Sequence, residues 1–418
     1  MKRRALVIGG SLGGLLAAHL LRCAGWHAVV FERNEEELTG RGVGLGTHPQ
    51  LVAVLRRAGI AFDEGMGIRV PKVVCLDRAG KIIVEQPTAR TMSAWSRLHR
   101  ALRDALPVQD YRLGKKLNRV EQDSDGIRAI FADATAERGD LLIGADGIRS
   151  TVREQFLPQT QPVYAGYVAW RAVLDESLVP PDIRRQIFEL YTFCLPEGEQ
   201  LLAYPVPGRD DHTGVGDRRY NIVWYRPADP LALDDMCTDA SGRLHASGIA
   251  PPLIRNDVIA CVKADAAAVL APQIAEIFLR SDPFFQPIFD LESPALVFGR
   301  AVLVGDAAFV VRPHVGAGAT KAAIDAAVLA DCLRDTEDIQ NGLIRFERAQ
   351  LPFGRDMVAL SRQQGAYLSA QVKPLAQRQS GELRRDVEAL LHAHGTRSDQ
   401  ISEIVAARGL DVYLSATR

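Results

Sequence analysis

The feature that most constrains this chain is a glycine-rich turn between a short apolar run and a helix-like segment. The apolar run covers 5–8, the turn Gly9–Gly14, and leucines and alanines at helical spacing follow over 15–21. A second apolar run, 27–31, ends at the acidic residue Glu32. This order of strand, turn, helix, strand and acid predicts a β-α-β unit of the Rossmann type.

The turn predicts a site for the phosphates of a dinucleotide. Main-chain N–H groups at a helix start attract phosphate, and glycines let the backbone approach it. Ser11 stands at the middle glycine position of the usual fingerprint, where its hydroxyl can donate a hydrogen bond to phosphate. All six residues are predicted to contact the cofactor: Gly9, Gly10, Ser11, Leu12, Gly13 and Gly14.

Glu32 ends the second strand, where a carboxylate can accept hydrogen bonds from both hydroxyls of an adenosine ribose. Arg33 follows it and is assigned to the same cofactor site. The alternative is that Glu32 is a surface carboxylate paired with Arg33.

A second loop distinguishes FAD from NAD. The β-branched run 301–304 leads into Gly305-Asp306, and an alanine-rich helix-like segment covers 317–333. A carboxylate there suits a ribityl hydroxyl, and helix-start amides suit the pyrimidine edge of a flavin. The sequence therefore predicts FAD, with these contacts from the second loop: Gly305, Asp306, Pro313, Gly316, Ala317, Gly318 and Ala319.

Composition narrows the class of partner. Fifty basic and 51 acidic residues give a net charge of −1, so no charge surplus favours nucleic acid or an anionic membrane. No apolar stretch approaches the roughly 20 residues of a membrane span. The six cysteines show no metal-ligand spacing. We expect a cytoplasmic protein with free thiols, no metal site and a small-molecule partner.

At 418 residues the chain is long enough for two or three domains. We expect an α/β fold: a Rossmann-like FAD-binding domain, an inserted antiparallel-sheet substrate domain and a C-terminal helical segment. The turn Asp77–Gly80 predicts a hairpin, strand-like pieces at 200–206 and 220–225 follow, and a helical stretch lies near 253–280. The expected boundaries are 1–72, 97–160 and 296–340 for the FAD-binding domain, 73–96 and 161–295 for the substrate domain, and 341–418 for the helical segment.

Three motifs together resemble those of the group A FAD-dependent monooxygenases, the aromatic hydroxylases typified by p-hydroxybenzoate hydroxylase. They are the N-terminal fingerprint, Asp146-Gly147 and Gly305-Asp306, and the resemblance covers about residues 1–335. The stretches 166–171, 224–226 and 312–314 look most like the 2,6-dihydroxypyridine 3-hydroxylase branch.

The resemblance implies further cofactor residues. Asp146 and Gly147 would serve both FAD and the nicotinamide cofactor, because only one fingerprint is present. Gly44 lies in a stretch, 42–45, that in the family runs along the flavin. Trp95 replaces an arginine that usually reaches the flavin, and Arg97, two residues on, is the candidate substitute.

The resemblance also implies a reaction. NADH or NADPH reduces FAD, O₂ forms a C4a-hydroperoxide, and its distal oxygen adds to an electron-rich aromatic or N-heteroaromatic ring such as a hydroxypyridine. A histidine is the natural proton acceptor near neutral pH. We predict catalytic or substrate-contacting roles for His314, His48 and Tyr225. The alternatives are that each histidine merely hydrogen-bonds a loop carbonyl and that Tyr225 only packs in a sheet.

Other interpretations stay open at this point. A flavin halogenase or isoprenoid-chain reductase shares the fingerprint and the Gly-Asp loop, although a Trp-x-Trp-x-Ile-Pro halogenase signature is absent. A low-turnover flavin-binding redox protein is a third reading. The sequence does not decide between NADH and NADPH, and it leaves a homodimer open.

Overall fold

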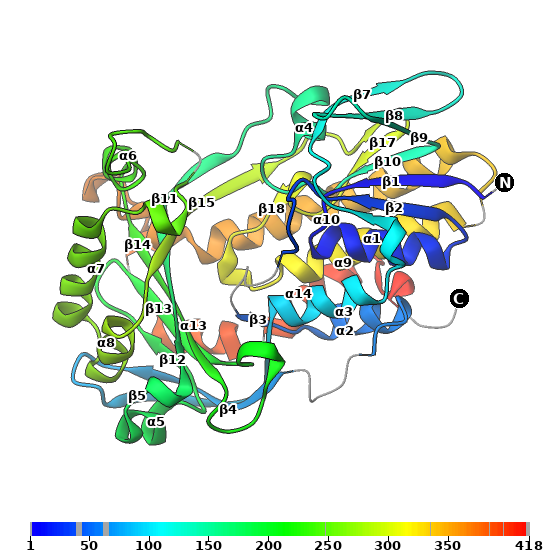
Figure 1. Ribbon diagram of the computed structural model, residues 1–418. Coiled ribbons are helices and arrows are strands. Elements are labelled where there is room, and N and C mark those ends of the chain that lie inside the picture. The colour runs from blue at the N-terminus through cyan, green and yellow to red at the C-terminus, as the bar shows by residue number, and fades with distance from the viewer. Residues whose placement is uncertain are drawn as a thin grey trace.

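The computed structural model describes residues 2–38, 44–61, 67–246, 248–334, 336–383, 385–395 and 397–414, and two large sheets dominate it (Figure 1). Residues 42 and 43 of the stretch expected along the flavin lie outside these ranges. The mixed α/β architecture predicted from the sequence is confirmed.

The first sheet has six strands, and its central strands run parallel. Because carboxyl ends of parallel strands meet at one edge, the loops after β1, β10 and β17 converge there. Those loops carry the fingerprint, Asp146-Gly147 and Gly305-Asp306. The strand order is β16 (Val297–Phe298), β17 (Ala301–Leu303), β10 (Leu141–Gly144), β1 (Arg4–Ile8), β2 (His27–Phe31) and β6 (Tyr111–Arg112).

Two helices that start at this edge pack against each other beside the sheet. These are α1 (Leu12–Cys23), which follows the fingerprint, and α9 (Gly318–Arg334), which follows the second loop (Figure 1). Helix α9 is buried on nearly all sides, as its alanine-rich, apolar sequence requires. Helices α2 (Pro49–Arg57) and α3 (Trp95–Asp104) pack against α9 and α1 respectively.

The second sheet has nine strands and includes the predicted hairpin and both predicted strand-like pieces. Helices α7 (Asn256–Val269) and α8 (Pro272–Leu279) account for the expected helical stretch, and they cover one face. The order is β18 (Phe309–Val310), β15 (Phe284–Glu292), β11 (Val163–Asp175), β14 (Arg219–Pro227), β13 (Gln200–Val206), β12 (Tyr191–Cys194), β4 (Ile68–Leu76), β5 (Ile82–Ala94) and β3 (Gly44–Gly46).

Successive side chains along each strand point to opposite faces of this sheet, so the two faces contact different parts of the protein. Trp170 and Trp224 point into the core under α7 and α8. Their neighbours Tyr167 and Tyr225 belong to the opposite face, toward the second loop.

Sheet membership differs in detail from the expected domain ranges. Strand β3, the first residues of β4 and strand β18 all pair in the nine-stranded sheet. Each lies within a range expected for the FAD-binding domain. Composition does not reveal which strands pair by hydrogen bonds. Because of this pairing, the chain passes several times between the body built on the six-stranded sheet and the body built on the nine-stranded sheet.

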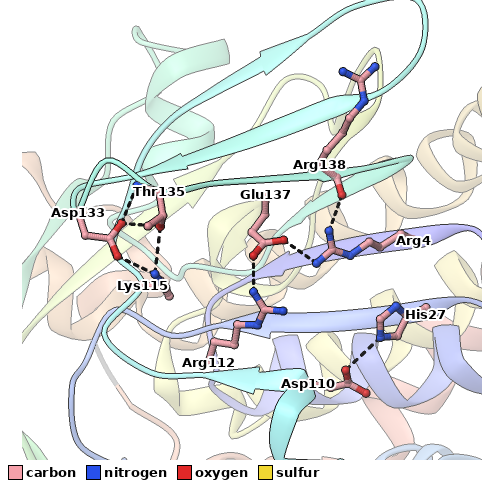
Figure 2. Close-up of polar contacts among 9 residues, drawn as sticks. All are labelled: Arg4, His27, Asp110, Arg112, Lys115, Asp133, Thr135, Glu137 and Arg138. Carbon is pink, nitrogen blue, oxygen red and sulfur yellow. Dashed lines mark hydrogen bonds and ion pairs between the residues drawn. The ribbon is translucent and has the colours of Figure 1, made fainter.

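A three-stranded ribbon lies beside the first sheet and is attached by ion pairs. Figure 2 shows Arg4 from β1 and Arg112 from β6 reaching Glu137. The same view shows Lys115 held by Asp133, with Nζ 2.6 Å from Oδ2. The ribbon consists of β7 (Leu117–Gln122), β8 (Ile127–Phe131) and β9 (Ala136–Gly139).

The C-terminal segment is helical, as predicted, and it joins the two bodies. Helix α10 (Ile339–Gln364) packs on α9 and on β15 and β18, and α13 (Val387–Gly395) packs on β4 and β5 (Figure 1). Among the described residues, none of the helices is both long and apolar enough to cross a bilayer. The other helices are α4 (Thr151–Phe156), α5 (Pro181–Ile187), α6 (Pro230–Met236), α11 (Ala366–Ala370), α12 (Ser380–Leu383) and α14 (Arg397–Ala407).

Two glycines in the same turn of α1 should respond oppositely to alanine. A Cβ on Gly14 would lie 1.9 Å from the carbonyl oxygen of Gly9, whereas a Cβ on Gly13 would meet Ala322 Cβ at 3.4 Å. We expect Gly14→Ala to lower the free energy of unfolding by about 1–3 kcal/mol, because backbone must shift. Gly13→Ala should raise it by up to about 1 kcal/mol, because alanine is the better helix former. Urea unfolding of the FAD-free protein measures both, because it excludes changes in FAD affinity, and equal effects would contradict the packing argument.

Candidate functional site

A first cavity of about 230 Å³ opens at the carboxyl ends of β1, β2 and β10. The fingerprint forms one side, and the Asp146-Gly147 loop forms another. Of the predicted cofactor residues, those lining it are Gly9, Gly10, Ser11, Glu32, Arg33, Asp146 and Gly147.

Glu32 is fixed at the floor of this cavity by main-chain donors. Its Oε2 accepts from Gly10 N at 2.8 Å and its Oε1 from Asn34 N at 3.0 Å, with only 5% of the residue exposed. A Cβ on Gly10 would lie 2.3 Å from the Tyr111 hydroxyl, so only glycine fits there. The burial of Glu32 therefore argues against the alternative that it is a surface carboxylate.

Asp146 presents an unsatisfied acceptor. Its Oδ2 accepts from Thr151 N at 2.7 Å, whereas Oδ1 is buried and has no hydrogen-bond partner among the described residues. Burial raises the pKa of this carboxyl, against the lowering effect of its hydrogen bonds. A buried acceptor without a donor is costly. A hydroxyl or amide of a bound cofactor would satisfy it, so the residues present fit a dinucleotide.

Four cations surround the first cavity, which suits a pyrophosphate. They include Arg33, predicted from the sequence, and Arg149, which the sequence analysis missed. Burial lowers the pKa of Arg149, and the charge of Arg33 lowers it further. The other two are Lys115 and Lys116.

A second cavity, of about 440 Å³, lies between the nine-stranded sheet and the second loop. Trp95 lines both cavities, so they adjoin at its ring. The predicted residues that line the second cavity are Gly44, Tyr225, Asp306, Pro313, Gly316, Ala317, Gly318 and Ala319. The first cavity suits the pyrophosphate end of FAD, and the larger second cavity suits the flavin end.

A buried ion pair holds the turn before Asp306. Lys321 Nζ donates to the Gly305 carbonyl at 3.0 Å and to Asp325 Oδ2 at 2.8 Å, and the same Oδ2 accepts from Gly305 N at 2.9 Å. Both polar groups of Gly305 are thus fixed, and its φ of +61° favours glycine. Sequence reasoning missed the pair, although the i,i+4 spacing of Lys and Asp in α9 signals it.

Asp306 is exposed to the second cavity but surrounded by protein on its other sides. Desolvation raises the pKa of its carboxyl, and the Lys321 ammonium opposes this rise. Arg153 links the neighbouring loops, donating to the Ala307 carbonyl at 3.1 Å and the Ile148 carbonyl at 2.6 Å. The two cofactor loops are therefore one hydrogen-bonded unit.

The predicted histidines lie behind the cavity walls. His314 is 1% exposed, its Nε2 is 2.8 Å from the Tyr167 hydroxyl, and its ring centroid is 4.2 Å from that of Tyr225. His48 occupies the position just before α2, and its Nε2 lies 3.2 Å from the Gly316 carbonyl oxygen. Neither histidine lines the second cavity. Any catalytic role of His314 would be exerted through Tyr225, and any role of His48 through the loop that contains Gly316.

Arg97 is directed elsewhere, because its Nη1 donates to the Asp211 carbonyl at 3.0 Å. It does not line either cavity, and Trp95 occupies the position between them. Trp95 stacks on His99 at 4.7 Å, and His99 Nε2 is 3.0 Å from the Gly10 carbonyl.

Comparison with known proteins agrees with this geometry. A family model described as an FAD binding domain matches residues 2–210, and one described as FAD binding domain-like matches 164–290. The 2,6-dihydroxypyridine 3-monooxygenase of Paenarthrobacter nicotinovorans is 32% identical over 360 residues, 84% of this chain and 88% of that protein. The chain belongs to the group A FAD-dependent aromatic hydroxylases.

Two further similarities extend the comparison. The 6-hydroxynicotinate 3-monooxygenase of Bordetella bronchiseptica is 28% identical and aligns with 80% of this chain and 84% of its own length. A solved structure of 2,6-dihydroxypyridine-3-hydroxylase from Arthrobacter nicotinovorans superposes with a TM-score of 0.82 at 29% identity, covering 88% of this chain and 93% of that one.

Family membership fixes the enzyme class. The hydroxylase is an FAD-dependent monooxygenase that uses NAD(P)H and O₂ to hydroxylate an aromatic or N-heteroaromatic ring. The readings as a halogenase, a reductase or a low-turnover redox protein are set aside.

Replacing Lys321 tests the buried pair. Lys321→Met leaves the Asp325 charge buried without its partner, so we expect a loss of about 3–5 kcal/mol of unfolding free energy and weaker FAD retention. Adding Asp325→Asn should restore part of the loss, because it removes that charge and keeps an acceptor for Gly305 N. Lys72→Met, which breaks an exposed pair with Glu85, should cost no more than about 1 kcal/mol. Equal losses of unfolding free energy in Lys321→Met and Lys72→Met would contradict a stabilising role for the buried Lys321–Asp325 pair.

Acidification should destabilise the fingerprint region. Burial lowers the pKa of His99 and of His19 below the ordinary value of 6.5. As pH falls, these histidines bind protons in the unfolded chain before they do so in the folded protein. The free energy of unfolding therefore keeps its full value above about pH 6.5 and declines below that pH. Each histidine contributes at most about 1.4 kcal/mol per pH unit between its two pKa values. Urea midpoints from pH 7.5 to 5 should fall less steeply for His99→Gln, and an unchanged slope would exclude His99.

Proposed function

We propose that this enzyme hydroxylates a hydroxypyridine or a closely similar N-heteroaromatic ring in the second cavity. The observation that carries the proposal is the wall of that cavity: three tyrosines from the sheet face oppose the cofactor loop. The tyrosines are Tyr191, Tyr204 and Tyr225. Two relatives reported above are named for hydroxypyridine-type substrates, which agrees with this choice.

We assign the two ends of FAD to the two cavities. Gly9–Gly14 would receive the pyrophosphate, Glu32 the ribose and Asp306 the ribityl chain, with the amides of 316–319 at the pyrimidine edge. FAD, when bound, supplies the electron transfer from NAD(P)H and the activation of O₂. The chain supplies binding, orientation and exclusion of water.

Tyr225, supported from behind by His314, forms the proposed proton-handling side of the cavity. Tyr225 lines the cavity, and His314 packs directly behind its ring. Burial raises the pKa of Tyr167, so its phenol stays protonated, and its hydroxyl shares a hydrogen bond with His314 Nε2. His314 would therefore act as a positioning residue that sets the orientation of Tyr225, rather than as a group in contact with the substrate.

His314→Ala should slow hydroxylation by about 10- to 100-fold while FAD affinity changes little, because the side chain supports Tyr225 and does not line the cavity. Tyr167→Phe is the matched variant, since it keeps the ring and removes the hydroxyl that bonds His314 Nε2 and contacts Arg312. Single-turnover rates and FAD titrations across pH 6–9 measure both effects. Unchanged turnover of His314→Ala over that range would remove His314 from the mechanism.

The proposed substrate class can be tested with ¹⁸O₂. Purified holoenzyme is screened with hydroxypyridines, hydroxybenzoates and phenols for accelerated oxidation of NADH and of NADPH. We expect hydroxypyridines to give the highest kcat/KM and a product heavier by one ¹⁸O atom. Accelerated oxidation without oxygen incorporation would overturn the proposal. The domain boundaries, a homodimer and a cytoplasmic location stay predictions.

A further inference from the structure

We propose that the substrate ring carries an anionic substituent, such as a carboxylate, which binds Arg171 and Arg90 on the sheet side of the second cavity. The inference rests on the proposed function and adds a substrate class to it. Both arginines line this cavity together with the three tyrosines.

Arg171 lies near the middle of the sheet. It is on β11, where it pairs with Val223 of β14 and Phe284 of β15, and Val223 also lines the cavity. Its Nε donates to Gln286 Oε1 at 2.7 Å, which orients the guanidinium. Among the described residues this is its one hydrogen bond, so its two terminal nitrogens can serve a ligand. Most side chains around it in the cavity wall are aromatic or apolar, so a cation there favours a ligand that brings a counter-charge.

Arg90 approaches the same space from β5. Its guanidinium lies 5.7 Å from the ring centroid of Tyr191, and its Nη2 passes close to Gly46. The two arginines also converge on Tyr204: each lowers the pKa of that phenol, although burial dominates and raises it. One side of the cavity therefore holds two cations around a tyrosine cluster.

The charge balance of the cavity favours an anion. Among the described residues that line it, Asp306 is the one acidic side chain, and it belongs to the cofactor loop. Burial raises the pKa of Asp306, which weakens it further as a counter-charge. Guanidinium groups bind carboxylates through paired, charge-assisted hydrogen bonds. The phosphates of FAD are assigned to the first cavity with its own four cations, so they do not account for this pair.

The test compares rings that differ only in this substituent. Holoenzyme without NADH is titrated with 6-hydroxynicotinate, its neutral amide and 2-hydroxypyridine, and binding is followed by flavin absorbance. We expect the carboxylate to bind about 10- to 100-fold more tightly than the amide. Arg171→Gln should abolish this preference and leave amide binding within about threefold, whereas Arg171→Lys should keep part of it.

The control is Arg280→Gln, which removes an exposed cation paired with Glu276 and should leave the preference intact. Equal binding of carboxylate and amide by the wild-type holoenzyme, or an equal loss for all three compounds in Arg171→Gln, would overturn the inference. Turnover is scored separately. Oxygenated product from 2-hydroxypyridine with no preference for the carboxylate rejects the anion site alone. Preferential binding without oxygenation of any hydroxypyridine supports the site and rejects the proposed function.

Discussion

The parallel pairing of β1 with β10, and of β10 with β17, is the constraint on which the rest of the site depends. These strands come from residues 4–8, 141–144 and 301–303, yet their carboxyl ends share one edge. Three loops that are remote in sequence therefore meet at that edge. Without this register the fingerprint, Asp146 and Asp306 would have no common ligand.

Buried polar contacts convert that meeting of loops into a fixed geometry. The Lys321–Asp325 pair holds both polar groups of Gly305, and Arg153 connects the second loop to the Asp146-Gly147 loop. Each charge is removed from water, so each needs its partner in place. Such networks favour one arrangement of the loops, and they present Asp306 toward the cavity instead of into the core.

The nine-stranded sheet contributes the other half of the site through its two-residue alternation. One face places tryptophans against α7 and α8, which anchors the sheet. The other face presents tyrosines and Arg171 toward the cofactor loop. The C-terminal helices contact both bodies, so the distance between sheet and loop is set by packing of segments far apart in the chain.

The sequence alone determined the dinucleotide fingerprint, the Gly305-Asp306 loop and the α/β fold, because each depends on local spacing and short-range hydrophobic pattern. It did not reveal that His314 and His48 lie behind the walls, that Arg97 points to the Asp211 carbonyl, or that Arg171 and Arg90 share one cavity. Those facts depend on strand pairing and on which face of a sheet a residue occupies. Only the tertiary structure sets such long-range register.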